Sequence, residues 1–403
     1  MIINILFKVK RCRMCHKQII GNNIMNRRFE VLDAFRGICA VSVVVFHMHL
    51  VDSVTELSFF RGSYIFVEFF FVLSGFVLAH GYAYKNHLNF TDFMKARFFR
   101  LYPLQLFMFV VMFFLELGKL AAYKLGGFIF NNTPFTNSFA IKEIIPNLLL
   151  VQSWTSYTDP LSFNFPSWSI SVEFYMYVLF FCSIVVFKHK PIIWLTSSLI
   201  SFLLIYLQSP SITPEVLRGV SCFFGGTFTY WLFMKSSSFK LSATIGTCVE
   251  LMLLTSIVIV VQSVFEYRFF VASVLFMVAV FFFAFEFGFI SKMLKLKYFQ
   301  LMGKLSYSIY MTHAAILFCL TSLGFVIQKI TEKDFTPMIN GLRFLNFGST
   351  LTNNAMVLAI LLVVISLSLI TYKYIEVPGQ KLNSRSKNIG YTNELLMDER
   401  NEK

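Results

Sequence analysis

The 403-residue chain is too apolar for an ordinary soluble protein. Hydrophobic side chains make up 57% of its residues and charged side chains only 14%, whereas soluble domains average about 25% charged residues. Its net charge of +14 would suit a nucleic-acid-binding protein. However, the lysines and arginines lie between apolar runs, where the positive-inside rule places them. Composition therefore argues against nucleic-acid binding and indicates a membrane protein.

Ten apolar runs follow one another along the chain. Each is near the roughly 20 residues that a helix needs to cross about 30 Å of hydrocarbon. The runs are 35–52, 64–84, 103–125, 168–188, 192–208, 216–234, 242–262, 267–288, 305–328 and 355–375. We predict an all-α, polytopic membrane protein of about ten transmembrane helices.

Lysine and arginine alternate between the connections of these runs. The segment before the first run is strongly basic, and so are the connections after the second, fourth, sixth, eighth and tenth runs. The alternate connections are poorer: 53–63 carries only Arg61 and 126–167 only Lys142. Ten spans with both termini in the cytoplasm satisfy the positive-inside rule, and we expect that topology.

The predicted domain division is simple. Residues 1–28 form a basic N-terminal extension, 29–380 a single membrane domain and 381–403 a polar cytoplasmic tail. Met25 lies at a more usual distance before the first run, so the first 24 residues are interpreted as an upstream extension. Cys12, Cys15 and His16 form a CxxCH motif there, but no second ligand pair with zinc spacing follows, and we expect no metal site.

Ionisable residues inside apolar runs are costly, so each is either functional or paired for structure. His47 follows Arg36 by eleven positions, which returns a helix to nearly the same face about 16 Å further along. Histidine suits proton transfer from a hydroxyl near neutral pH. Taken alone, such a histidine more often bonds a neighbouring helix for packing.

Arg97 and Arg100 lie just before Pro103 and share a helical face at i, i+3 spacing. Guanidinium groups suit phosphates, so this pair is a candidate for binding the phosphates of coenzyme A. The alternative is a basic cluster that only sets topology. Pro103 predicts the first turn of the third span at this point.

Glu68 and Glu173 also fall inside runs, where a carboxylate needs a partner. Ser167 precedes the fourth run and is predicted to cap that helix. Ser74 and Gly75 favour close approach of two helices. His313 and Glu376 are further candidates of the same kind.

Six sequence blocks carry most of these residues in a fixed order. They are 32–37 with Asp33 and Arg36 running to His47; 67–76 with Glu68, Ser74 and Gly75; Arg97-x-x-Arg100 followed by Pro103; Ser167-Trp168-Ser169 with Glu173; 303–313 with Tyr307 and His313; and 374–378 with Glu376. Together they resemble the acyltransferase 3 family of bacterial membrane proteins, over about residues 30–380. Ile170, where leucine is common, and the basic N-terminal extension depart from its pattern. The chain resembles a stand-alone member without an SGNH-type hydrolase domain.

The resemblance implies an O-acyltransferase of the bacterial inner (plasma) membrane. Its donor would be cytoplasmic acetyl-CoA or another acyl-CoA, and its acceptor a carbohydrate hydroxyl on lipopolysaccharide O-antigen, exopolysaccharide or a lipid-linked sugar. On this interpretation Arg36, Arg97 and Arg100 bind the donor. His47 acts as general base or transient acyl carrier, and Glu68 or Glu173 orients its ring. The supporting residues are Asp33, Ser167, Trp168, Ser169, Tyr307, His313 and Glu376.

Two other functions fit parts of the sequence. A proton-coupled transporter or flippase of lipid-linked glycan would use His47, Glu68 and Glu173 as a proton relay, but neither inverted repeats nor paired broken helices are visible. A scaffold for glycan-assembly proteins would leave the intramembrane histidine and carboxylates unexplained.

Overall fold

The computed structural model describes residues 27–382 except 86, 129, 131, 188, 189, 237 and 333. The CxxCH motif at 12–16, most of the predicted N-terminal extension and most of the predicted tail lie outside the described residues. The helices are α2 (Glu30–His47), α3 (Ser58–Gly62), α4 (Phe66–Tyr82), α5 (Phe90–Gly126), α6 (Ile144–Leu149), α7 (Ser167–Val186), α8 (Lys190–Tyr206), α9 (Pro214–Lys235), α10 (Ala243–Gln262), α11 (Arg268–Phe283), α12 (Phe289–Leu294), α13 (Lys297–Thr331) and α14 (Thr350–Thr371). A hairpin of β1 (Met338–Ile339) and β2 (Leu342–Arg343) follows α13, and a π-helical turn (Tyr372–Glu376) follows α14.

The fold is helical, as predicted, and a helix occupies each of the ten apolar runs. Among the described residues, six helical segments are long and apolar enough to cross a membrane: Ser58–Tyr82, Phe90–Gly126, Ser167–Val186, Ala243–Gln262, Lys297–Thr331 and Thr350–Leu382. α8 and α11 are apolar but shorter. The chain is therefore a multi-pass membrane protein, whereas ten crossings and the side of each terminus remain predictions.

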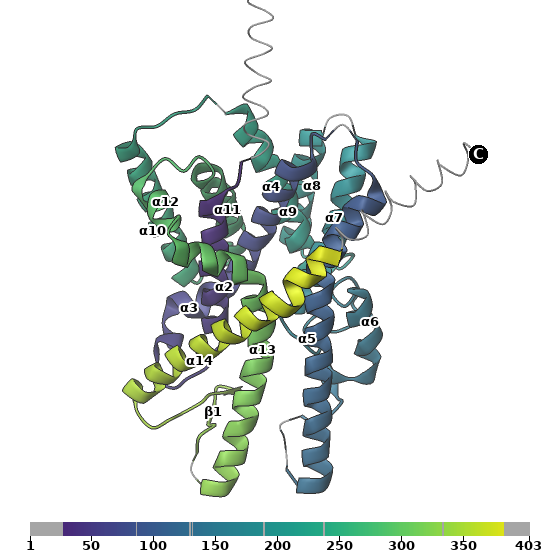
Figure 1. Cartoon of the computed structure of the whole chain (residues 1–403), viewed down its shortest axis with the longest axis vertical. Helices are drawn as coiled ribbons and strands as arrows, with labels where there is room; N and C mark the ends of the chain where they lie inside the picture. Colours follow the sequence, from purple (N-terminus) through teal and green to yellow (C-terminus); the bar gives the residue numbers. More distant parts are fainter. Residues whose placement is uncertain are drawn as a thin grey trace, which may run out of the picture.

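Two of the long helices begin well before the predicted spans. α5 starts at Phe90, where the Asn89 side chain accepts a hydrogen bond from the Thr91 amide, and α13 starts at Lys297. In Figure 1 the C-terminal ends of both helices extend past their neighbours at the lower end of the molecule. Pro103 consequently lies in the interior of α5, so its predicted place in the first turn is wrong. Its ring packs against Gly379, beside the end of the π-helical turn.

The predicted N-cap of α7 is also wrong. Ser167 is the first helical residue, Pro166 occupies the cap position, and no side chain caps this helix. The Ser167 hydroxyl instead accepts a hydrogen bond from Gln152, and its backbone amide donates to Asn164. The bend at Asn164–Pro166 therefore supplies a backbone partner for the first amide of α7.

Two glycine contacts position the helices that matter most for the site. A Cβ atom added at Gly37 of α2 would lie 2.5 Å from the backbone of Met302, and one added at Gly303 of α13 would clash with the Asp33 carbonyl oxygen. These clashes show that α2 and α13 touch backbone to backbone. Gly75 of α4 lies equally close to the Phe223 carbonyl of α9, which confirms the predicted close approach at Ser74-Gly75.

Candidate active site

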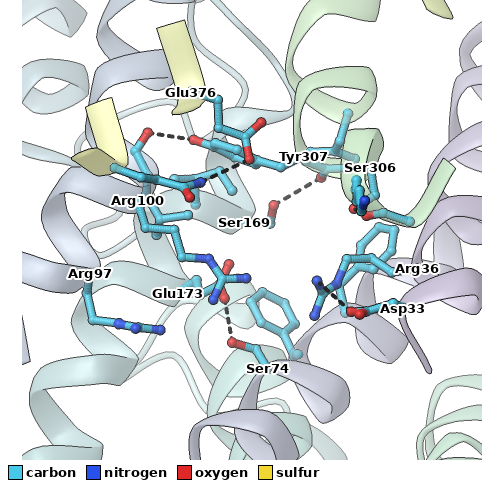
Figure 2. A pocket seen from close by; sticks show the side chains of 18 of the residues that line it. Asp33, Arg36, Ser74, Arg97, Arg100, Ser169, Glu173, Ser306, Tyr307 and Glu376 are labelled. Carbon is cyan, nitrogen blue, oxygen red and sulfur yellow. Dashed lines mark hydrogen bonds and ion pairs between the residues drawn. The ribbon is translucent and has the colours of Figure 1, made fainter. Parts of the chain in front are cut away.

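A cavity of about 590 Å³ lies between α2, α4, α5, α7 and α13, and the end of α14 closes it (Figure 2). Its polar lining residues are Arg28, Asp33, Arg36, Ser74, Tyr82, Arg97, Arg100, Ser169, Glu173, Lys304, Ser306, Tyr307, Tyr310, Tyr372, Glu376 and Gln380. The volume is within the range of small-molecule sites. Eight of the predicted site residues thus meet in one place: Asp33, Arg36, Arg97, Arg100, Ser169, Glu173, Tyr307 and Glu376.

Positive charge dominates this cavity. Five cations and three carboxylates line it, and Figure 2 shows Arg36 and Arg100 pointing inward from opposite walls. Asp33 lies 3.6 Å from Arg36 and 3.0 Å from Arg28. The excess of guanidinium and ammonium groups suits an anionic ligand, and arginine forks suit phosphate in particular.

Arg97 is held by aromatic side chains rather than by an acid. It donates a hydrogen bond of 3.1 Å to the Tyr82 hydroxyl, and its guanidinium lies 5.2 Å from the Tyr82 ring centre and 5.9 Å from that of Tyr177. Its Nε atom is buried and has no hydrogen-bond partner among the described residues. A buried donor without a partner is costly, so this arginine is positioned to gain from a bound anion.

Two of the three carboxylates in the cavity, Glu173 and Glu376, are fixed by hydroxyl groups. Oε1 of Glu173 accepts hydrogen bonds from Ser74 at 2.5 Å and Tyr177 at 2.6 Å. Glu376, in the π-helical turn, accepts from Ser308 at 2.8 Å. Both acids therefore keep a fixed orientation toward the cationic lining.

Two tyrosines of α13 complete the cavity wall. The Tyr307 hydroxyl donates to the Leu101 carbonyl of α5 at 2.7 Å. The Tyr310 and Ser169 hydroxyls are 3.0 Å apart, and the Tyr310 ring packs edge-on against Phe70 with centroids 5.7 Å apart. Hydroxyl contacts and ring packing thus fix this wall across α4, α5, α7 and α13.

His47 lies beyond that wall, next to His313. Nδ1 of His47 is 3.2 Å from Nε2 of His313 and 3.0 Å from the Val43 carbonyl oxygen. The Phe165 ring covers it, with centroids 4.5 Å apart. The Tyr310 ring links the two places, because it lines the cavity and its centroid is 6.0 Å from that of His313.

The structure corrects the expected partners of His47. Glu173 binds Ser74 and Tyr177, and Glu68 forms an ion pair with Arg218 of α9. Glu68 is fully buried, and Arg218 is the cation that compensates it. The ring partner of His47 is therefore a second histidine, and the predicted orientation by Glu68 or Glu173 is wrong.

The remaining predicted residues support the framework. Trp168 lies under Arg218, whose guanidinium is 5.1 Å from its ring centre, and Ser167 binds Gln152. Sequence reasoning missed Arg218, although it lies in an apolar run like Glu68 and the same criterion would have found it. It also missed Tyr82 and Tyr177, because nothing in a single sequence separates such tyrosines from other membrane aromatics.

The sequence of the chain matches a known acyltransferase family over most of its length. A family model described as an acyltransferase domain, acyltransferase 3, matches residues 29–373. The chain is similar to "Acyltransferase MdmB" of Streptomyces mycarofaciens, with 36% identity over 29% of this chain and 27% of that protein. It is also similar to "Protein 2 in picA locus" of Rhizobium radiobacter, with 42% identity over 24% of this chain and 46% of that protein. The chain thus spans less than half the length of these curated relatives, and no solved structure matches it. Because the family model covers most of the chain, including the cavity lining from Asp33 to Tyr372, this protein belongs to the acyltransferase 3 family.

Proposed function

We propose that this protein transfers an acyl group, expected to be acetyl, from acyl-CoA to a hydroxyl group of a cell-surface or lipid-linked carbohydrate, in the bacterial inner membrane. The observation that carries the proposal is the cationic cavity beside His47. Arg36, Arg97 and Arg100 line the cavity, and α13 leads directly from its wall to the histidine pair.

The cavity has the chemistry that an acyl-CoA donor needs. Coenzyme A carries several phosphates, and the arginines offer forked donors for them. Arg28 near the start of α2, Lys304 near the start of α13 and Gln380 near the last described residue all line it. These are the helix ends that the positive-inside rule assigns to the cytoplasm, where acyl-CoA is available.

The proposed reaction uses His47 as a general base. The proton of the acceptor hydroxyl moves to the imidazole while the oxygen forms a bond to the acyl carbon. The bond between that carbon and sulfur then breaks, and the thiolate takes the proton from the imidazolium. The products are an ester and free coenzyme A, and the histidine returns to its neutral form.

Purified protein, [14C]acetyl-CoA and envelope glycan extracted from the producing cells provide the test. We expect label on the glycan with wild-type protein and with His87→Gln, an exposed histidine outside the cavity. We expect about a 100-fold or greater loss with His47→Ala at matched expression, since general-base catalysis contributes roughly 10²–10⁴-fold. A transporter or flippase would leave the glycan unlabelled in every sample, and full activity of His47→Ala would refute the assignment of the base.

A further inference from the structure

Two histidines from different helices meet at the same depth of the molecule. α2 and α13 run in the same direction, because Gln300 contacts the Glu30 carbonyl, Gly303 contacts Asp33, and His313 contacts His47. Each histidine lies ten residues after the glycine that makes the close contact, Gly37 on α2 and Gly303 on α13. The backbone packing of these helices therefore brings the two rings together.

The hydrogen bonds of His47 determine where its proton lies. Nδ1 is 3.0 Å from the Val43 carbonyl oxygen, which can only accept, so Nδ1 must carry the hydrogen. The neighbouring Nε2 of His313, 3.2 Å away, then faces a donor and must be the acceptor. Neutral His313 accordingly carries its own proton on Nδ1, a buried atom that has no hydrogen-bond partner among the described residues.

This arrangement leaves one ring atom of His47 for chemistry. Within the part of the chain that the structure describes, no hydrogen bond involves Nε2 of His47, and the residue is only half-buried, whereas His313 is fully buried. Phe46 and Phe165 pack on the His47 ring, at centroid distances of 4.7 Å and 4.5 Å, and limit its rotation.

We infer that His313 is a positioning residue of His47: its Nε2 shares the Nδ1–H of His47 with the Val43 carbonyl, and together they leave Nε2 of His47 as the atom that takes the proton. The inference rests on the proposed function, in which His47 is the base. His313 occupies the place that a carboxylate occupies in a serine-protease triad, where it fixes the tautomer and stabilises the imidazolium.

A neutral histidine as the partner of His47 changes the charge balance of the site compared with a carboxylate. It accepts the Nδ1–H hydrogen bond without placing a second full charge in a buried site, where an unpaired carboxylate would be expensive. When His47 gains a proton on Nε2, the positive charge is shared across the pair through the Nδ1–H contact. The proton returns from Nε2 to the thiolate, so no net charge remains after turnover.

Two substitutions at one position test the assignment. His313→Gln places an amide oxygen near the position of Nε2 and keeps an acceptor, whereas His313→Leu keeps bulk and removes it. We expect kcat to fall about 100-fold in His313→Leu and much less in His313→Gln. KM for acetyl-CoA should remain near the wild-type value in both, because His313 does not line the donor cavity. His87→Gln serves as the control, and a wild-type kcat in His313→Leu would overturn the inference.

A spectroscopic measurement does not depend on turnover. In histidine-labelled protein, the Nδ1–H proton of His47 should give a low-field ring signal in the wild type, His87→Gln and His313→Gln. It should shift in His313→Leu, where the Val43 carbonyl is the remaining acceptor of that proton. If His313→Leu does not fold, the test rests on the wild type and His313→Gln: absence of the low-field signal in both would refute the inference. If His47→Ala loses activity and His313→Leu does not, the inference about His313 is refuted but the proposed function stands. If the glycan stays unlabelled in every sample, the proposed function is refuted. The ring signal then still shows whether His47 and His313 are hydrogen-bonded.

Discussion

The cavity and the Glu68–Arg218 region differ in how their buried charges are compensated. Around Glu68, one fully buried carboxylate is matched by the guanidinium of Arg218, which in turn stacks on Trp168. In the cavity, five cations face three carboxylates around about 590 Å³ of space, and a buried nitrogen of Arg97 has no partner among the described residues. In the first region the carboxylate has its own cation, although Oε2 of Glu68 has no hydrogen-bond partner among the described residues, whereas the cavity keeps an excess of cations for a ligand.

Breaking the ion pair should produce the largest effect on stability. Arg218→Leu leaves Glu68 buried without its cation, and we expect a loss of about 3–5 kcal/mol in the free energy of unfolding. The double variant Glu68→Leu with Arg218→Leu should recover most of that loss, because it removes both charges. Residual folded protein after heating, measured by fluorescence-detected size exclusion, checks both.

If Arg218→Leu and the double variant were equally stable, the ion pair with Arg218 would not be the interaction that stabilises buried Glu68. The double variant also tests the predicted catalytic role of Glu68. Retained acyl transfer would exclude that role and leave Glu68 as a structural residue.

Removing a cavity cation should affect binding rather than folding. Arg100→Gln removes a guanidinium that points into the cavity, and we expect coenzyme A to bind about 10- to 100-fold more weakly, as for loss of hydrogen bonds to a charged group. Calorimetric titration of the purified protein with coenzyme A measures this. Lys142→Gln, whose side chain is 72% exposed and outside the cavity, is the control and should bind normally. If Arg100→Gln bound normally but unfolded as readily as Arg218→Leu, the two regions would not differ in kind.

The smallest expected effect comes from the helix contact that serves the cavity and the histidine pair together. Gly303→Ala places a Cβ atom against the Asp33 carbonyl, so α13 must shift from α2 at a cost of about 1–3 kcal/mol. Acyl transfer should fall as well, because the same contact sets the register of His47 and His313. Gly118→Ala in α5 has open space around the added atom and should keep wild-type activity. Equal thermal stability and activity of both variants would show that the contact is not required.

Several residues of the site could be predicted because their arrangement depends on spacing within a single helix. The i, i+3 spacing of Arg97 and Arg100 places both on one face of α5, and both line the cavity with Arg36. The partners of His47 and Glu68 could not be predicted in this way. His313 is 266 residues from His47, and Arg218 is 150 residues from Glu68. Helical periodicity gives the face that a residue occupies, but not which helix packs against that face.

The sequence by itself determined that the protein lies in a membrane, that it is helical and that it carries the motifs of its family. Apolar runs and short motifs act through local geometry and through the cost of exposing polar groups to lipid. Only the tertiary structure decided that Glu68 pairs with Arg218, that Glu173 binds Ser74 and Tyr177, and that a second histidine accompanies His47. It also decided where α5 and α13 begin, since their first turns contain exposed and polar residues that hydropathy does not recognise as part of a span. These outcomes depend on backbone contacts such as Gly37 with Met302 and Gly303, which arise only when distant helices come together.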